Sequence, residues 1–223
     1  LPLSGVTVIE FCQIAAGPYC GMLLADMGAE VIKVEPPTGD AMRQWPPLND
    51  GFSENFASVN RNKRSIALDL KSEADLDIAL RLARRADVLI ENNRPGVMDR
   101  LGLGYEALSG DNPGLVYCSI SAFGQQGPRS REGAFDVTMQ GISGIMSVTG
   151  EPEGAPVKCG VPVSDFATGL YGAFNIVSAL LRRGMSGKGT HVDAPMLGAS
   201  LGIAALQTSE YFGTGNHPRT VSY

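Results

Sequence analysis

The sequence has little charge and few of the residues that mark a metal or nucleic-acid site. Only 18% of its 223 residues are charged, and the net charge is −5. Because nucleic-acid-binding proteins usually carry a basic excess, this class is excluded, and an anionic ligand needs a local basic cluster. The two histidines and four cysteines include no CxxC pair. We therefore predict no metal site.

Targeting and nucleotide signatures are also missing. No apolar run approaches the ~20 residues of a transmembrane helix, and residues 1–5 lack the segments of a signal peptide. We expect a cytoplasmic protein with reduced cysteines and no membrane partner. Neither G-x-G-x-x-G nor G-x-x-x-x-G-K-[ST] follows the first apolar run. This argues against dinucleotide and P-loop sites.

The residues that are present alternate between strand and helix patterns. Strands are predicted at residues 6–11, 31–35, 65–70, 88–91, 115–121 and 192–194. A helix over 18–27 joins the first two strands, and residues 36–60 are predicted to form a long loop. Ser72 and Asp75 mark a further helix start. The pattern predicts an α/β fold, an open and mostly parallel (Rossmann-like) sheet with helices on both faces.

The clearest predicted helix follows Asp165. Apolar residues recur there at helical spacing, at Phe166, Leu170, Phe174, Val177 and Leu181. Asp165 is predicted to cap the N-terminus of this helix. Its carboxylate is expected to stay ionised beside the helix dipole, and so to be able to act as a nucleophile. From spacing alone, both roles stay open, and they are compatible.

Two basic clusters follow predicted strands. Arg61, Lys63, Arg64 and Lys71 surround one strand, and Arg94 and Arg100 come after Asn92 and Asn93. Solvated charged surfaces are one explanation. The other is a ligand, because open α/β sheets bind ligands at the carboxyl ends of their strands. A phosphate-rich ligand could use both clusters.

Several stretches, in order, carry a family resemblance. They are AGP at 16–18 with LADMGAEVIKVE at 24–35, NRNKRSIALDLK at 60–71, ENNRPGVMDRLG at 91–102 and SDFATG at 164–169, followed by GKG at 187–189. Together they resemble the class III CoA-transferase family, the formyl-CoA and carnitine CoA-transferase type. The resemblance spans residues 3 to about 212.

The resemblance implies both a fold and an activity. Residues 1–223 are similar to the N-terminal part of the large domain of the class III CoA-transferase fold, without the small domain, its glycine-rich loop and the C-terminal return. The implied activity is transfer of coenzyme A from an acyl-CoA thioester to a small carboxylic acid through an aspartyl-CoA intermediate on Asp165. Coenzyme A is then a substrate, and no tightly bound cofactor is implied. Full-length family chains form an interlocked homodimer.

The resemblance also implies a path for coenzyme A. Its cofactor-binding positions correspond here to Ala15, Leu68, Lys71, Asn92, Asn93 and Arg100. Lys71 and Arg100 suit phosphate groups. Two positions depart from some relatives, since Ala15 replaces a glutamine near the catalytic carbonyl and Pro36 replaces an arginine that stacks on the adenine.

Two alternatives to the transferase remain. The family includes α-methylacyl-CoA racemases, which pair the equivalent aspartate with a histidine. Phe135, just before Asp136, stands at that position and cannot move a proton. The other alternative is a truncated, non-catalytic chain that binds coenzyme A.

Overall fold

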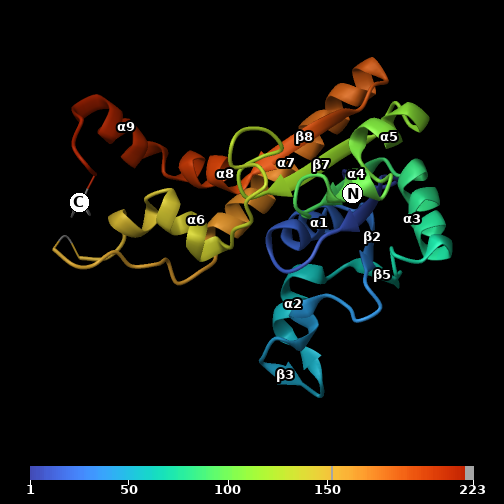
Figure 1. The fold of residues 1–223 in the computed structure, drawn as a ribbon, viewed down its shortest axis with the longest axis horizontal. Helices are drawn as coiled ribbons and strands as arrows, with labels where there is room; N and C mark the ends of the chain where they lie inside the picture. Colours follow the sequence, from blue (N-terminus) through green and yellow to red (C-terminus); the bar gives the residue numbers. More distant parts are fainter. Residues whose placement is uncertain (152, 219–223) are drawn as a thin grey trace.

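The computed structural model describes residues 1–151 and 153–218. Within them, a six-stranded sheet has the order β5-β2-β1-β6-β7-β8, and its paired strands are parallel (Figure 1). The strands are β1 (Thr7–Phe11), β2 (Glu30–Glu35), β5 (Lys63–Ala67), β6 (Val88–Glu91), β7 (Val116–Ser121) and β8 (Thr190–Pro195). The strand order reverses between β1 and β6, as in doubly wound sheets. The predicted Rossmann-like sheet is confirmed.

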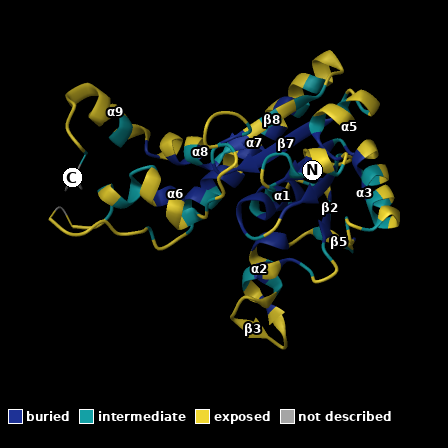
Figure 2. Cartoon of the chain, viewed as in Figure 1, coloured by how far each residue is buried: buried dark blue, intermediate teal, exposed yellow. Residues whose placement is uncertain are grey.

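Helices cover both faces of this sheet, as predicted. One face packs against α1 (Ala16–Asp26) and α7 (Val163–Ser186), and the other against α3 (Glu73–Arg85), α4 (Val97–Arg100) and α5 (Tyr105–Asp111). Alternate strand residues serve the two cores because side chains alternate along a strand. Val8 belongs to the first core, and Ile9 to the second. The central strands β1, β6 and β7 are accordingly almost completely buried (Figure 2).

Helices α1 and α7 approach each other closely because small residues line their contact. A Cβ atom added to Gly169 would lie 2.7 Å from the Ala16 carbonyl oxygen. One added to Gly172 would lie 3.3 Å from the Cys20 sulfur. Position 169 therefore cannot take a larger residue unless one of the helices moves. The close contact brings the first turns of the two helices to the same edge of the sheet.

The apolar residues that predicted α7 lie on its outer face. Leu170, Phe174 and Leu181 are 51%, 69% and 72% exposed. The inner face consists mostly of small residues, among them Ala173 and Ala179, together with the fully buried Ile176. The apolar spacing predicted the helix correctly. It did not identify the buried face, because that face is mostly glycine, alanine and small polar residues, with Ile176 as its only large apolar residue that is fully buried.

The prediction of one long loop over residues 36–60 is wrong. The segment contains η1 (Ala41–Gln44), a hairpin of β3 (Leu48–Asn49) and β4 (Phe52–Ser53), and α2 (Glu54–Asn60). Side chains cap both helical elements. Asp40 accepts the Met42 N–H at 2.9 Å, and the Ser53 hydroxyl accepts the Phe56 N–H at 3.2 Å. Elements this short show no periodicity, although Ser53 is a helix-start signal.

Other element boundaries differ slightly from the predictions. Helix α1 begins at Ala16, ahead of Pro18, and β5 ends at Ala67 instead of at residue 70. Ser72 precedes α3 as predicted but makes no side-chain cap. Instead, the Asp75 carboxylate accepts a hydrogen bond from the Asp69 N–H at 2.8 Å. Helix α5 was not predicted.

An arm of helices extends to one side of the sheet (Figure 1). It comprises α6 (Asp136–Ile142), η2 (Ile145–Val148), α8 (Met196–Ile203) and α9 (Ala205–Thr214). Among the described residues, no helix is both long enough and apolar enough to cross a membrane.

Candidate active site

A cavity of about 370 Å³ lies where the strand order reverses. Residues just after β1 line it (Gln13, Ile14, Ala15, Ala16), as do residues just after β6 (Asn92, Asn93, Arg94, Pro95). Asp165 and Phe135 also contribute to the lining. Because the carboxyl ends of β1 and β6 meet at this edge, the cavity occupies the usual ligand position of a doubly wound sheet.

Asp165 does not cap α7, contrary to the prediction. The helix begins at Val163, so Asp165 lies inside its first turn, and Pro162 occupies the N-cap position without a side-chain bond. Asp136, in α6, takes the capping role from outside the helix. Its Oδ1 accepts the Ser164 N–H at 2.8 Å and the Asp165 N–H at 3.3 Å. A second carboxylate thus serves the helix terminus and leaves the Asp165 side chain for the cavity.

The expectation that Asp165 stays fully ionised is also wrong near neutral pH. Burial, and to a smaller extent the neighbouring charge of Asp136, raise the pKa of Asp165 to about 7. The helix dipole does not compensate, because the Asp136 carboxylate already occupies the terminal N–H groups. At neutral pH, Asp165 therefore exists in both its ionised and its protonated form.

A second cavity, of about 220 Å³, adjoins the first. Gln13 and Asn93 line both cavities, and Leu68 and Lys71 line the second one together with Pro36. Three of the predicted coenzyme A residues, Leu68, Lys71 and Asn93, thus line this second cavity. Lys71 is an exposed residue, so its side chain can meet a ligand that enters this cavity from solvent.

The structure gathers most, but not all, of the predicted site residues. Ala15, Asn92 and Asp165 share the first cavity, whereas Arg100 is exposed and is absent from the described lining of both. The side chain of Asn92 is bound to the backbone. It accepts the Gln13 N–H at 3.0 Å and donates to the Gln13 carbonyl at 2.8 Å.

Three of the four residues of the first basic cluster are already paired with carboxylates of the protein. Arg61 pairs with Asp26, and Arg64 pairs with Glu30. The Lys63 side chain is only 2% exposed, and its Nζ lies 2.8 Å from Glu10 Oε2. These pairs join residues distant in the sequence, so local charge counting could not reveal them. In this cluster, Lys71 alone lines either of the two cavities among the described residues.

Comparison with known proteins assigns the family. The profile of CoA-transferase family III matches residues 3–222. The chain belongs to this family. The resemblance noted in the sequence is therefore confirmed.

Family III relatives are similar over nearly the whole chain. It is 44% identical to the succinate–glutarate CoA-transferase of Agrobacterium fabrum, in an alignment covering 97% of this chain and 56% of the relative. It is 43% identical to the acetyl-CoA:oxalate CoA-transferase of Acetobacter aceti, covering 99% and 57%, respectively. A crystal structure of a CAIB/BAIF family protein from Brucella suis matches with a TM-score of 0.95 at 42% identity, covering 99% and 60%. The chain thus spans little more than half the length of these family members.

The structure adds two functional candidates that the sequence reasoning missed. Gln13 connects the two cavities, and the signal for it was its place directly after a buried strand. Asp136 was noted only as the neighbour of Phe135, because nothing in the sequence shows that α6 lies against the start of α7. Its effect on the pKa of Asp165 makes it part of the candidate site.

Proposed function

We propose that the whole protein transfers coenzyme A from an acyl-CoA thioester to a free carboxylic acid, with Asp165 as the nucleophile. One observation carries the proposal. A half-buried carboxylate with a raised pKa lines a cavity at the switch point of the sheet, and a second cavity lined by Lys71 adjoins it. Family membership supports the same conclusion.

The remainder of the proposal concerns the parts that relatives have in addition. Residues 1–223 are the N-terminal part of the large domain. A small domain with a glycine-rich loop and a C-terminal return complete it, and two complete chains form an interlocked homodimer. The coverage of 56–60% of each relative supports this division.

The proposed reaction conserves the energy of the thioester bond. The Asp165 carboxylate attacks the acyl carbonyl, the C–S bond breaks, and a mixed anhydride and the coenzyme A thiolate form. The thiolate then attacks the aspartyl carbonyl, which releases the donor acid as a carboxylate and leaves an aspartyl-CoA thioester. The acceptor carboxylate reverses these steps and regenerates Asp165. Each step transfers an acyl group between oxygen and sulfur, so no net proton is consumed.

Two features of the cavity suit this chemistry. Partial burial removes water from Asp165, which makes the ionised carboxylate more reactive and protects the anhydride from hydrolysis. No side chain caps α1 at Ala15, so the partly positive start of that helix lies at the cavity. Backbone N–H groups at a helix start stabilise developing negative charge on an acyl oxygen.

We further propose a small dicarboxylic acid as a substrate. Arg94 lines the same cavity as Asp165, and a guanidinium binds a second carboxylate through paired hydrogen bonds. The names of the two relatives above, which mention succinate, glutarate and oxalate, support this substrate class.

The racemase alternative lacks its histidine base in this cavity. Phe135 occupies the position of the racemase histidine, and its side chain is 71% exposed and lines the cavity with Asp165. Among the described lining residues there is no histidine. The transferase reaction requires only the carboxylate, so the geometry favours it.

The direct test is a transfer assay on the whole protein. Purified protein is incubated with an acyl-CoA panel and with small mono- and dicarboxylic acids, and new thioesters are separated by chromatography. Hydroxylamine added after acyl-CoA should modify Asp165, which peptide mass spectrometry detects. A protein that instead exchanges the α-hydrogen of 2-methylacyl-CoA in D₂O is a racemase. One that binds coenzyme A without any turnover is the non-catalytic alternative.

Replacing Lys71 by alanine should weaken coenzyme A binding roughly three- to tenfold at low salt, because an exposed cation contributes a modest, screened attraction to phosphate. Titration calorimetry at two salt concentrations measures this. Arg81→Ala is the matched control, since Arg81 lies on α3, pairs with Asp77 and is 66% exposed. Lys71→Ala and Arg81→Ala with equal affinities at low salt would contradict the assignment. Arg100→Ala is measured in the same series, because the sequence predicted Arg100 as a phosphate contact, whereas the structure places it outside both cavities.

Transfer should increase with pH through about 7, because only the ionised carboxylate attacks and the pKa of Asp165 is raised to about 7. Asp136→Asn should move this rise in activity, the acidic limb of the pH profile, to lower pH, since it removes the charge that helps to raise the pKa of Asp165. The asparagine keeps an oxygen that can accept the Ser164 N–H. The profile of kcat/KM against pH measures the shift. Asp26→Asn, in an exposed pair with Arg61, serves as the control. An unchanged limb in Asp136→Asn would show that Asp136 does not tune Asp165.

A further inference from the structure

The loop that follows β1 contains a strained residue. Ile14 has a φ of +69°, in the left-handed region that β-branched residues rarely adopt. It lines the cavity that holds Asp165. A backbone in this state persists only when its surroundings hold it there, and such strain is found at functional sites. The contacts that hold residues 12–15 are therefore of interest.

Asp40 holds the strained residue directly. The Ile14 N–H lies 3.3 Å and 3.2 Å from the two carboxylate oxygens of Asp40, which is completely buried. Both the backbone and the side chain of Asp40 are held by hydrogen bonds. Its N–H donates to Glu35 at 2.9 Å, and its carboxylate accepts the Met42 N–H at 2.9 Å. The segment after β2 thus places one oriented carboxylate under the loop after β1.

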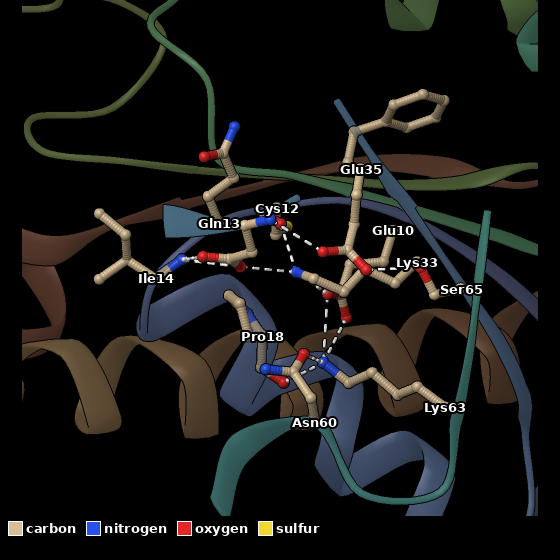
Figure 3. Close-up of polar contacts among 12 residues, drawn as sticks. Glu10, Cys12, Gln13, Ile14, Pro18, Lys33, Glu35, Asn60, Lys63 and Ser65 are labelled. Carbon is tan, nitrogen blue, oxygen red and sulfur yellow. Dashed lines mark hydrogen bonds and ion pairs between the residues drawn. The ribbon is translucent and has the colours of Figure 1, made fainter. Parts of the chain in front are cut away.

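A buried lysine connects this carboxylate to the rest of the loop. Lys33 is 1% exposed, and its Nζ lies 2.9 Å from Asp40 Oδ2. The same Nζ lies 3.2 Å from Glu10 Oε1 (Figure 3). It also donates to the Cys12 carbonyl at 2.6 Å. The loop is therefore bound by the Asp40–Lys33 pair at two places, the oxygen of residue 12 and the nitrogen of residue 14.

A second buried lysine extends the network to α1. Lys63 pairs with Glu10 and donates to the Pro18 carbonyl at 2.7 Å (Figure 3). Glu10 fits beneath the helix because residue 21 is glycine, and a Cβ there would collide with Glu10 Oε2. The two lysines balance Glu10 and Asp40, so the network buries no net charge. We call these four residues, Glu10, Lys33, Asp40 and Lys63, the buried ion network.

We propose that Asp40, supported by Lys33, is a positioning residue that keeps Ile14 in its left-handed conformation and so fixes residues 12–15 against Asp165. The inference rests on the proposed CoA transfer. Each step of that reaction needs the acyl carbonyl within attack distance of a carboxylate or thiolate, and small misplacements are costly. Asn92 binds Gln13 from the other side of the loop, so three consecutive residues have a fixed backbone. Neither Asp40 nor Lys33 is among the described lining of the cavity, so both act through the loop.

A double-variant cycle in the whole protein tests the proposal. Asp40→Asn replaces one acceptor oxygen by an amide NH₂, which faces a donor whichever way the amide turns, either the Lys33 ammonium or the Met42 N–H, so the hold on the loop is weakened. Ile14→Gly removes the conformational cost, because glycine adopts positive φ freely. We expect Asp40→Asn to lower kcat at least tenfold with Ile14 present and less than threefold in the Ile14→Gly background. The KM for acyl-CoA should change less than threefold. Asp26→Asn, in an exposed ion pair, should leave kcat unchanged.

The comparison of kcat in the two backgrounds and amide hydrogen exchange separate a positioning role from general stabilisation of the fold. If Asp40 only stabilises the fold, Asp40→Asn lowers kcat equally in both backgrounds, and this result would overturn the proposal. Amide exchange needs no turnover, so it tests the inference even where the transfer assay fails. The Ile14 amide should exchange slowly in the wild-type protein and at least tenfold faster in Asp40→Asn. An Ile14 amide that exchanges in the wild type like an open loop would overturn the proposal without any variant, including in the case that Asp40→Asn does not fold.

Discussion

Replacing Asp165 by asparagine is expected to reduce CoA transfer on the order of 10⁴-fold while leaving the fold intact. The amide is a far poorer nucleophile than the carboxylate and cannot form the anhydride or the aspartyl-CoA thioester. Its shape is nearly the same, so the cavity is preserved. Single-turnover assays of the whole protein with acyl-CoA measure the loss, and hydroxylamine should no longer modify residue 165. Near-normal turnover in Asp165→Asn would end the proposed mechanism.

The same variant should be more stable than the wild type at alkaline pH. The pKa of Asp165 is raised to about 7 in the folded protein, whereas an unfolded aspartate titrates near pH 4. The folded state therefore binds the proton more tightly, and the wild type loses stability as pH rises from about 4 to about 7. Asparagine carries no such penalty. We expect a gain on the order of 2 kcal/mol at pH 8, after allowing for partial exposure, and little difference near pH 4, measured by urea unfolding.

The outcome separates the two roles that the sequence left open. If Asp165 were the N-cap of α7, Asp165→Asn would slightly lower the free energy of unfolding, because asparagine interacts more weakly with the helix dipole. The structure gives the cap to Asp136, so the expected sign is the opposite. A loss of stability at pH 8 would show that Asp165 interacts favourably with the helix terminus after all.

The largest expected effect on stability comes from Glu10→Gln. Glu10 is completely buried and pairs with both Lys33 and Lys63. Removing its charge leaves Lys33 paired with Asp40 alone and removes the carboxylate that pairs with Lys63. Breaking a buried pair from one side costs about 3–5 kcal/mol. Denaturant unfolding of the whole protein measures the change.

A matched surface pair provides the control for Glu10→Gln. Asp26 and Arg61 are 28% and 54% exposed, and Asp26→Asn should cost less than about 1 kcal/mol. Adding Lys63→Met to Glu10→Gln should recover part of the lost stability, because it removes one uncompensated charge. Equal, small losses in Glu10→Gln and Asp26→Asn would show that water or structural relaxation compensates the buried lysines.

The features of the fold that depend on local patterns were predictable. Continuous apolar runs separated by helical segments identified the parallel sheet and the helices on its two faces, and β6 has the predicted bounds, Val88–Glu91. The segment over residues 36–60 was missed because its elements are too short for a periodic signal. Helix α7 was found mainly from residues on its exposed face, since its buried face is mostly small residues, which carry little hydrophobic signal.

The site was predictable where it depends on strand ends, and not where it depends on contacts between distant segments. Residues that follow β1 and β6 meet in one cavity because parallel strands end at the same edge. The raised pKa of Asp165 arises from burial and from Asp136, which belongs to another helix. Likewise, Lys63 was grouped with surface charges, and its burial depends on Glu10 in another strand. Pairings of this kind exist only once the chain has folded.

The glycine at position 21 has an evolutionary consequence. Any side chain there would displace Glu10, and a displaced Glu10 would leave Lys33 and Lys63 unpaired. These positions can therefore drift only as a set, with glycine at 21 accompanying the acid at 10 and the bases at 33 and 63. Descendants that lose the acid are free to enlarge residue 21, provided that both lysines are exchanged for apolar residues. Statistical covariation across the family should accordingly join a helical glycine to charges on two different strands.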